Sequence, residues 1–149
     1  MNSRLRVLLV CTGNAARSQM AEALVRSLSN GTIDVHSAGT HPKEAVHPMA
    51  TSVMREDFGI DLSGQSPKSI DRYVGQDFDY VITLCDDAAE TCPVFPGAPE
   101  TIHWGFSDPA AVETSPEDQR HAFEKVGSEL AGRIRLWLAL PKVSDRATT

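Results

Sequence analysis

The sequence predicts an α/β fold in which a parallel β-sheet is flanked by helices. Residues 7–10 and 80–84 are apolar runs without polar alternation, which is typical of strands buried on both faces of a sheet. Segments with apolar residues at helical spacing lie between the strand-like runs. Because strands and helices alternate along the chain, we expect βαβ units with right-handed crossovers and strands that all run in one direction.

The elements of the first half follow in order. The strand at 7–10 leads through a loop of small residues into a helix over 18–29, where apolar side chains recur every four positions. Alternating apolar and polar residues predict a second strand over 33–39. A His-Pro pair opens a second helix over 47–58, and Gly59 is expected to end it.

The second half adds two more strands and the longest helix. A short helical piece is expected within 66–74, ahead of the strand at 80–84. Residues 86–99 contain three prolines and a glycine, so they predict a long loop. Alternating Ile, Trp and Phe predict a fourth strand over 102–106. Ser-Pro followed by acidic residues opens a last helix over 115–137, and the polar tail after it is expected to fray.

Length and composition limit the classes of protein. The chain has 149 residues, 41% of them hydrophobic, so we expect a single domain over 1–149. A net charge of −6 disfavours nucleic acid and acidic membranes as partners. No apolar run is long enough for a membrane span or a signal peptide, which predicts a cytoplasmic protein. No long apolar stripe is left uncovered, which favours a monomer.

The three cysteines are expected to be reduced in such a compartment, so catalytic or redox roles gain weight over structural disulfides. In a parallel sheet all the carboxyl ends of the strands lie along one edge, where ligands bind. The first strand leads to Cys11, the third to Cys85 and the fourth to Asp108. These three groups are therefore expected to share that edge. The histidines and cysteines show no metal-ligand spacing, so no metal site is predicted.

Cys11 and Arg17 are six positions apart, on either side of a loop of small residues between a strand and a helix. Such a loop can turn its backbone N–H groups inward, and the helix adds the positive end of its dipole. The Arg17 guanidinium can grip two oxygens of a tetrahedral anion. The same field should hold Cys11 as a nucleophilic thiolate. The predicted oxyanion-binding residues are Thr12, Gly13, Asn14, Ala15, Ala16, Arg17 and Ser18.

Four further residues have two interpretations each. Asp108 would be the general acid that protonates a leaving oxygen, or a plain Asp-Pro turn residue. Cys85 and Cys92 are seven positions apart, so they would meet as a disulfide if the intervening loop bends, or they are structural cysteines. Cys85 at a strand end fits a structural role better than Cys92 does. Glu22, on the first helix, supports the loop or is a solvated surface residue.

Four segments resemble the thioredoxin-coupled arsenate reductases, which share the low-molecular-weight tyrosine phosphatase fold. They are VCTGNAARSQMAEAL, VHSAGT, VITLCDDAAETCPVFPG and HWGFSDPA, and the similarity runs from the first strand to the final helix. The spacing of Cys85 and Cys92 and the HWGFSDP segment are the most specific elements. The resemblance implies a three-layer sandwich with a four-stranded parallel sheet of order 2-1-3-4.

The resemblance also implies a mechanism for arsenic detoxification. Cys11 would attack arsenate while Asp108 protonates the departing oxygen and Arg17 holds the developing charge. Cys85 would then attack Cys11 and release arsenite, and Cys92 would take over the disulfide for reduction by thioredoxin. Phosphate and sulfate would act as substrate analogues, and no cofactor would be needed. Catalytic roles are thereby implied for Cys11, Cys85, Cys92, Arg17 and Asp108.

Two departures from the family pattern bear on these expectations. Some relatives have an additional cysteine where this chain has Ala16, and the three-thiol relay does not need it. Some relatives bind potassium through a carboxylate at the position of Lys68, so we predict that this chain needs no potassium.

Two other functions compete with arsenate reduction. The main alternative is a phosphatase acting on phosphotyrosine or small phosphate esters. Ala110 and Ala111 after the Asp-Pro pair lack the aromatic ring expected for phosphotyrosine. The other alternative is a non-enzymatic redox sensor, which would not need Asp108.

Overall fold

A computed structural model describes residues 4–147 and contains the predicted parallel sheet. Four strands are hydrogen-bonded in the order β2-β1-β3-β4, and every neighbouring pair is parallel. The fold class predicted from the sequence and the strand order implied by the resemblance are therefore confirmed. The strands are β1 (Leu5–Cys11), β2 (Ile33–Gly39), β3 (Tyr80–Thr83) and β4 (Glu100–His103).

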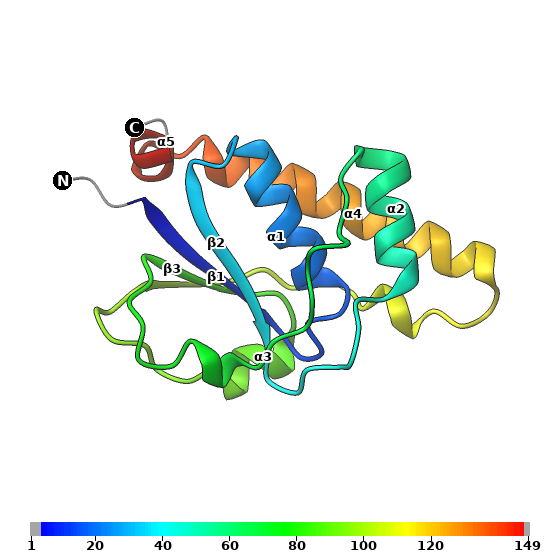
Figure 1. Cartoon of the computed structure of the whole chain (residues 1–149), viewed down its shortest axis with the longest axis horizontal. Coiled ribbons are helices and arrows are strands. Elements are labelled where there is room, and N and C mark those ends of the chain that lie inside the picture. Colours follow the sequence, from blue (N-terminus) through cyan, green and yellow to red (C-terminus); the bar gives the residue numbers. More distant parts are fainter. Residues whose placement is uncertain (1–3, 148–149) are drawn as a thin grey trace.

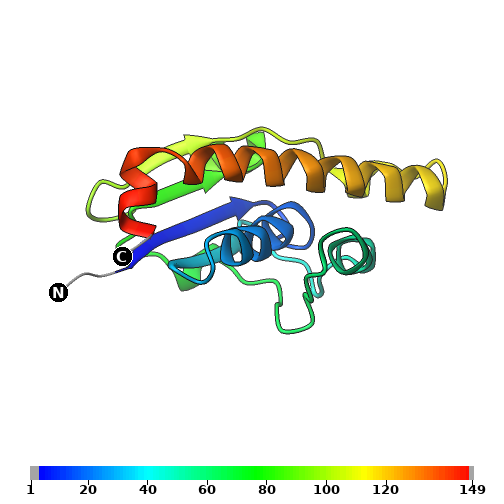
Figure 2. The ribbon, with the colours of Figure 1, turned by 90° about the horizontal axis from the view of Figure 1, so that it is seen from above.

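Helices cover both faces of the sheet (Figures 1 and 2). The long C-terminal helix α4 packs against α1 and α2, and with α1 and α5 it covers one face. The helix α3 and the 3-10 turn η1 lie on the other face. The helical elements are α1 (Arg17–Leu28), α2 (Pro48–Phe58), η1 (Ile70–Arg72), α3 (Asp86–Thr91), η2 (Pro109–Ala111), α4 (Pro116–Leu138) and α5 (Pro141–Ala147).

The predicted helix boundaries follow local chemistry. Gly59 ends α2 with a φ of 68°, a left-handed conformation that glycine adopts without strain. The Ser115 hydroxyl accepts a hydrogen bond from the Asp118 N–H at the start of α4, and Pro116 occupies the first helical position. Trp104 and Trp137 are both buried in the core.

The prediction was wrong in three places. Residues 86–91 form α3 rather than loop, because Asp86 and Asp87 favour a helix N-terminus and Ala88 is fully buried. The fourth strand ends at His103 and includes only Ile102 of the three alternating residues that predicted it; Trp104 is buried because it packs on Trp137. The tail forms α5, which fully buries Val143. The helical piece expected within 66–74 is only the short turn η1.

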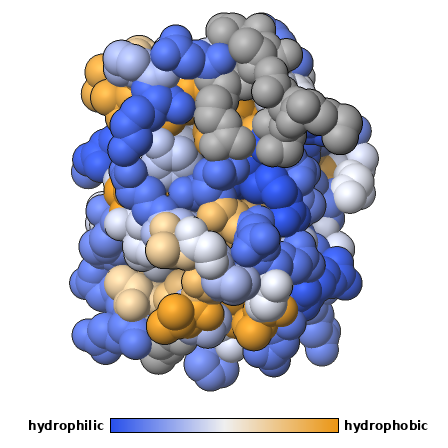
Figure 3. All heavy atoms as spheres, turned by 90° about the vertical axis from the view of Figure 1, so that its left-hand side faces the viewer, coloured by the Kyte–Doolittle hydropathy of each residue, from blue (hydrophilic) through white to orange (hydrophobic). Residues whose placement is uncertain are grey.

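The end of the molecule where the strands begin has a mostly hydrophilic surface with some apolar side chains gathered low on it (Figure 3). The carboxyl ends of the strands lie at the opposite end. No helix within the described residues 4–147 is both long and apolar enough to span a bilayer.

Candidate active site

The loop that follows β1 encloses the side chain of Cys11. The sulfur is buried, and it lies 2.7 Å from the Ser18 hydroxyl oxygen and 3.2 Å from the Asn14 backbone nitrogen. Both groups can donate a hydrogen bond to a thiolate. Cys11 therefore sits at the base of the loop with donors aimed at its sulfur.

Residues 40–47 run along the outside of the loop and pair with it. Their N–H groups donate to four loop carbonyls at 2.8 to 3.1 Å. Because these carbonyls are satisfied on the outer side, the inner side is left to the N–H groups that a bound anion needs. The donors are Thr40, His41, Lys43 and His47, and the acceptors are Cys11, Thr12, Gly13 and Ala15.

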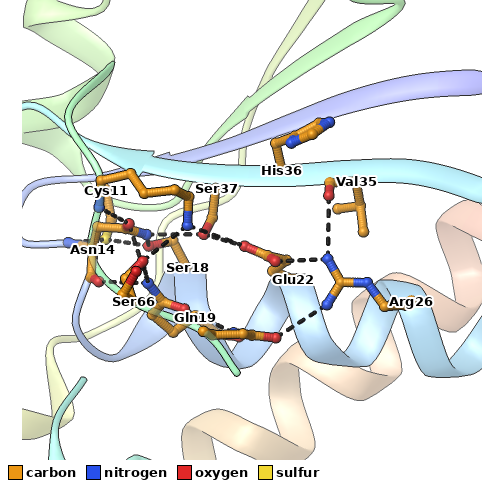
Figure 4. A network of polar contacts seen from close by, with 12 residues as sticks. Cys11, Asn14, Ser18, Gln19, Glu22, Arg26, Val35, His36, Ser37 and Ser66 are labelled. Carbon is orange, nitrogen blue, oxygen red and sulfur yellow. Dashed lines mark hydrogen bonds and ion pairs between the residues drawn. The ribbon is translucent and has the colours of Figure 1, made fainter. Parts of the chain in front are cut away.

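Asn14 holds the loop in this shape (Figure 4). It is fully buried with a φ of 49°, a conformation that asparagine tolerates better than most residues. Its amide nitrogen donates to the hydroxyls of Ser18 and Ser37 at 2.7 and 3.0 Å. Its carbonyl oxygen accepts from the Lys68 N–H and the Gln19 amide at 2.8 and 3.1 Å. The polar groups of Asn14 are thus used to connect the loop to its surroundings.

Glu22 extends this network along α1 (Figure 4). Its buried carboxylate accepts from Ser37 and pairs with Arg26 at 2.7 Å. The Lys68 ammonium lies 3.7 Å from the other side of the carboxylate. Burial lowers the pKa of Lys68 from its ordinary value, and the charge of Glu22 partly opposes that shift. Glu22 therefore supports the loop, which is the first of the two interpretations allowed by the sequence.

Arg17 begins α1 and is mostly buried. Its Nη1 donates to the Phe106 carbonyl at 2.9 Å, and its Nη2 lies 3.9 Å from the Asp108 carboxylate. Asp108 also accepts the Ala110 N–H at 3.0 Å and so caps η2. Its two predicted roles do not exclude each other, because one oxygen caps the turn while the other lies on the Arg17 side.

A cavity of about 40 Å³ opens directly over Cys11. The loop lines one side of it, and Asp108 and Ala110 line another. The N-terminus of α1 adds to the positive field, since Ala16 at its cap makes no side-chain hydrogen bond to the first turn. The cavity thus brings together the predicted nucleophile, the loop, Arg17 and Asp108.

Cys85 contacts the loop at Thr12 but does not line the cavity over Cys11. Its sulfur is buried and is 3.2 Å from the Thr12 hydroxyl oxygen. It lines a second cavity of about 350 Å³ together with Arg17 and Phe106. The pairing of β1 with β3, in which Val10 is opposite Thr83, carries Cys85 to this position. The sheet therefore delivers a second thiol to the oxyanion loop, as the sequence predicts.

Cys92 lies at the other end of α3 and is half-buried beside a cavity of about 380 Å³. Burial raises the pKa of its thiol. Seven positions along a helix correspond to a rise of about 10 Å, whereas a disulfide needs Cα atoms within about 7 Å. All three cysteines are free thiols in this structure. Cys92 can reach Cys85 only if α3 unwinds.

Three residues of the site were missed by the sequence analysis. Lys43 and His47 line the cavity over Cys11. A Cβ atom at Gly39 would lie 2.6 Å from the Thr12 carbonyl oxygen, so only glycine lets β2 pass this close to the loop. The sequence marks His47 only as a helix start, and no local pattern marks the other two. Within residues 4–147, no cluster of three His, Cys, Asp or Glu side chains could hold a metal ion.

Comparison with known proteins shows the family of this chain. Residues 6–144 match the family described as low molecular weight phosphotyrosine protein phosphatase. An arsenate reductase of Halalkalibacterium halodurans is 41% identical over 91% of this chain and 95% of its own length. A solved arsenate reductase in the phosphate binding state is 32% identical, with a TM-score of 0.70, over 91% of this chain and 97% of that one.

A second solved structure is described as thioredoxin-dependent. It is an arsenate reductase of Corynebacterium glutamicum, 30% identical with a TM-score of 0.68, and the match covers 90% of this chain and 60% of that one. The match of the family model and the identity to the relatives both span most of the chain. The relatives described above, 30 to 41% identical to this chain, are arsenate reductases. The chain belongs to the low molecular weight phosphotyrosine protein phosphatase family.

Proposed function

We propose that this protein reduces arsenate to arsenite through a relay of three thiols that thioredoxin regenerates. One observation carries the proposal: the sulfur of Cys85 lies 3.2 Å from Thr12, the neighbour of Cys11 in the oxyanion loop. A phosphatase that works through Cys11 has no use for a second thiol at this place. A reductase needs one, because the electrons for arsenic come from two sulfur atoms.

The first step is a displacement at arsenic. The Cys11 thiolate attacks As(V), one oxygen leaves as water, and a covalent sulfur–arsenic bond forms. Asp108, on the wall of the cavity, supplies the proton that the leaving oxygen needs. Arg17 and the loop N–H groups stabilise the negative charge of the transition state. This step uses the machinery that the fold shares with phosphatases.

The second step transfers two electrons to arsenic. The Cys85 thiolate attacks the sulfur of Cys11, and the electron pair of the sulfur–arsenic bond goes to arsenic. Arsenite leaves with As(III), and Cys11 and Cys85 are joined in a disulfide. Thr12 contacts Cys85 on this path, so the loop that binds the anion also holds the attacking thiol.

The third step moves the disulfide away from the cavity. The Cys92 thiolate attacks Cys85, which frees Cys11 and leaves a Cys85–Cys92 disulfide for the dithiol of thioredoxin to reduce. The helix α3 must unwind for this attack, and it has only 6 residues. Its first turn is held to β4, because His103 donates to the Asp86 carboxylate at 2.9 Å. The contact favours movement of the Cys92 end while Cys85 stays in place.

Phosphatase activity is the second candidate, because phosphate and arsenate are both tetrahedral oxyanions. The residue after Asp108-Pro109 that lines the cavity is Ala110, which offers no aromatic face to a phenyl ring. Weak hydrolysis of small phosphate esters is therefore expected, and efficient hydrolysis of phosphotyrosine is not. A cytoplasmic location, where thiols stay reduced, and a monomeric state are also part of the proposal.

Arsenate turnover with thioredoxin, thioredoxin reductase and NADPH tests the proposed function. The wild-type protein is expected to release arsenite continuously, and Cys92→Ser is expected to stop after one turnover. Equal cycling by the variant would contradict the three-thiol relay. Hydrolysis of phosphate esters by a wild-type protein that releases no arsenite would favour the phosphatase alternative.

A further inference from the structure

Two residues outside the Cys-x5-Arg loop also line the cavity over Cys11. Lys43 and His47 both come from the segment 40–47, which pairs with the outer side of the loop. The backbone N–H of each one donates to a loop carbonyl, that of Gly13 or Ala15. The backbone that carries these two side chains is thereby fixed to the loop at two points, and the relay described above uses neither side chain.

The Lys43 side chain lies over Gly13. A Cβ atom built on Gly13 would be 3.2 Å from both Cγ and Cε of Lys43, so the aliphatic stem covers the place of the missing side chain. The ammonium group at the end of this stem brings a positive charge to the mouth of the cavity. The whole chain has a net charge of −6, so an incoming dianion needs such local cations.

The ring of His47 is oriented by two neighbours. Its Nδ1 accepts the Met49 N–H at 3.0 Å and caps α2, which leaves the proton of a neutral ring on Nε2. One face of the ring packs on Phe123 of α4, with centroids 4.8 Å apart. With Nδ1 bound to α2 and a face on α4, the Nε2–H edge is the part of the ring that can donate into the cavity.

The charged groups around His47 come from three elements. Lys43 lies on the same segment, Asp108 caps η2, and Arg17 begins α1, while the contact from α4 is the uncharged Phe123. Burial and the charge of Lys43 lower the pKa of His47, and Asp108 partly opposes this. The ring is therefore neutral at neutral pH, and it offers the cavity a hydrogen bond without a charge.

From this geometry we infer that Lys43 and His47 are substrate-binding residues that complete the ring of donors around the tetrahedral anion. Lys43 contributes a flexible charge at the mouth, and His47 contributes one fixed N–H inside it. That the bound anion is arsenate rests on the proposed function. That the two residues bind an oxyanion rests on the cavity alone.

The variants separate substrate contact from structural support. Lys43→Ala removes the charge and Lys43→Arg keeps it. His47→Asn removes the imidazole donor but keeps an N-cap side chain for α2, whereas His47→Ala removes both. Lys142→Ala is the matched control, because it removes one lysine charge on α5, at the opposite end of the molecule.

Protection of Cys11 measures oxyanion binding without any turnover. In a Cys85→Ser/Cys92→Ser background Cys11 is the only cysteine, and inorganic phosphate should slow its alkylation by iodoacetamide. His47→Asn is expected to weaken this protection about tenfold, as for the loss of one hydrogen bond to a charged group. Lys43→Ala should weaken it by about fivefold at low salt and less at high salt, while Lys43→Arg and Lys142→Ala keep it.

Steady-state kinetics with all three cysteines present give the second measurement. Lys43→Ala and His47→Asn should raise the KM for arsenate with little change in kcat, since the later thiol steps do not involve these side chains. Arsenite release with unchanged KM and unchanged protection in both variants would overturn the inference. If the wild-type protein releases no arsenite, the proposed function fails, and the protection measurement still decides the inference by itself.

Discussion

The sulfur of Cys85 lies 3.2 Å from the hydroxyl oxygen of Thr12. These residues are 73 positions apart in the chain, and the pairing of β1 with β3 brings them together. Val10 is opposite Thr83 in this pairing, so Thr12 and Cys85, each two residues further along, emerge side by side. A phosphatase-type anion loop thereby gains a thiol at its edge, which is the arrangement a reductase needs.

Asp108→Asn tests the general acid. We expect turnover of arsenate to fall by about 10²–10⁴-fold, because an amide cannot protonate the leaving oxygen. The asparagine side chain can still accept the Ala110 N–H, so η2 should keep its cap. Phosphate protection of Cys11 should therefore persist in Asp108→Asn. A variant that turns over arsenate at nearly the wild-type rate would contradict the role of Asp108 as the acid and would leave it only the turn.

Gly39→Ala tests the close approach of β2 to the loop. The added Cβ would lie 2.6 Å from the Thr12 carbonyl, so the loop must shift. A displacement of about 1 Å in a catalytic loop can lower activity by about a hundredfold, and we expect a loss of that size. Gly64→Ala is the control, since a Cβ there has no heavy atom within 4 Å. Similar activity in both variants would show that the loop tolerates the contact.

The position of Lys68 beside Glu22 predicts that activity and stability do not depend on potassium. Its ammonium lies 3.7 Å from the Glu22 carboxylate and is largely buried, so it neutralises the charge that a cation would otherwise balance. Exchange of sodium for potassium at constant ionic strength should leave kcat/KM and the melting temperature unchanged. A large gain of either quantity in potassium would show that the ammonium does not serve in place of the ion.

The lowered pKa of His47 predicts a pH-dependent contribution to stability. The unfolded chain binds a proton at His47 near pH 6.5, whereas the folded chain binds it only at lower pH. The contribution is therefore complete above pH 6.5 and is lost as the pH falls toward the folded pKa. Urea unfolding at pH 7.5 and pH 5.5 should show a larger loss for the wild-type protein than for His47→Asn. Equal losses of stability in the two proteins would show that His47 is not the source of the pH dependence.

The parts of the fold and site that follow local rules could be predicted. The apolar run before Cys11 and the helical spacing after Arg17 place the loop between a strand and a helix. Parallel strands then require Cys85 to emerge near Cys11. The sequence could predict this edge of the sheet, because the direction of the strands and the buried apolar runs determine it without any side-chain detail.

The rest depends on tertiary contacts that leave no periodic trace. The helix α3 was missed because prolines after Cys92 outweigh the helix-favouring Asp86 and Asp87 in a sequence pattern. Lys43 lines the cavity only because residues 40–47 fold back along the loop. Glycine is required at position 39 because the carbonyl oxygen of Thr12, in another segment, leaves no room for a Cβ atom. None of these relationships can be seen in the local sequence.

The central claim is that Cys11 and Cys85 form a disulfide as arsenite leaves, and the Cys92→Ser variant tests it most directly. After one equivalent of arsenate, mass spectrometry of the alkylated, digested variant should find a Cys11–Cys85 disulfide in the same amount as the arsenite released. The matching Cys85→Ser variant should release no arsenite. Arsenite release by Cys92→Ser with Cys85 still open to alkylation would contradict the account.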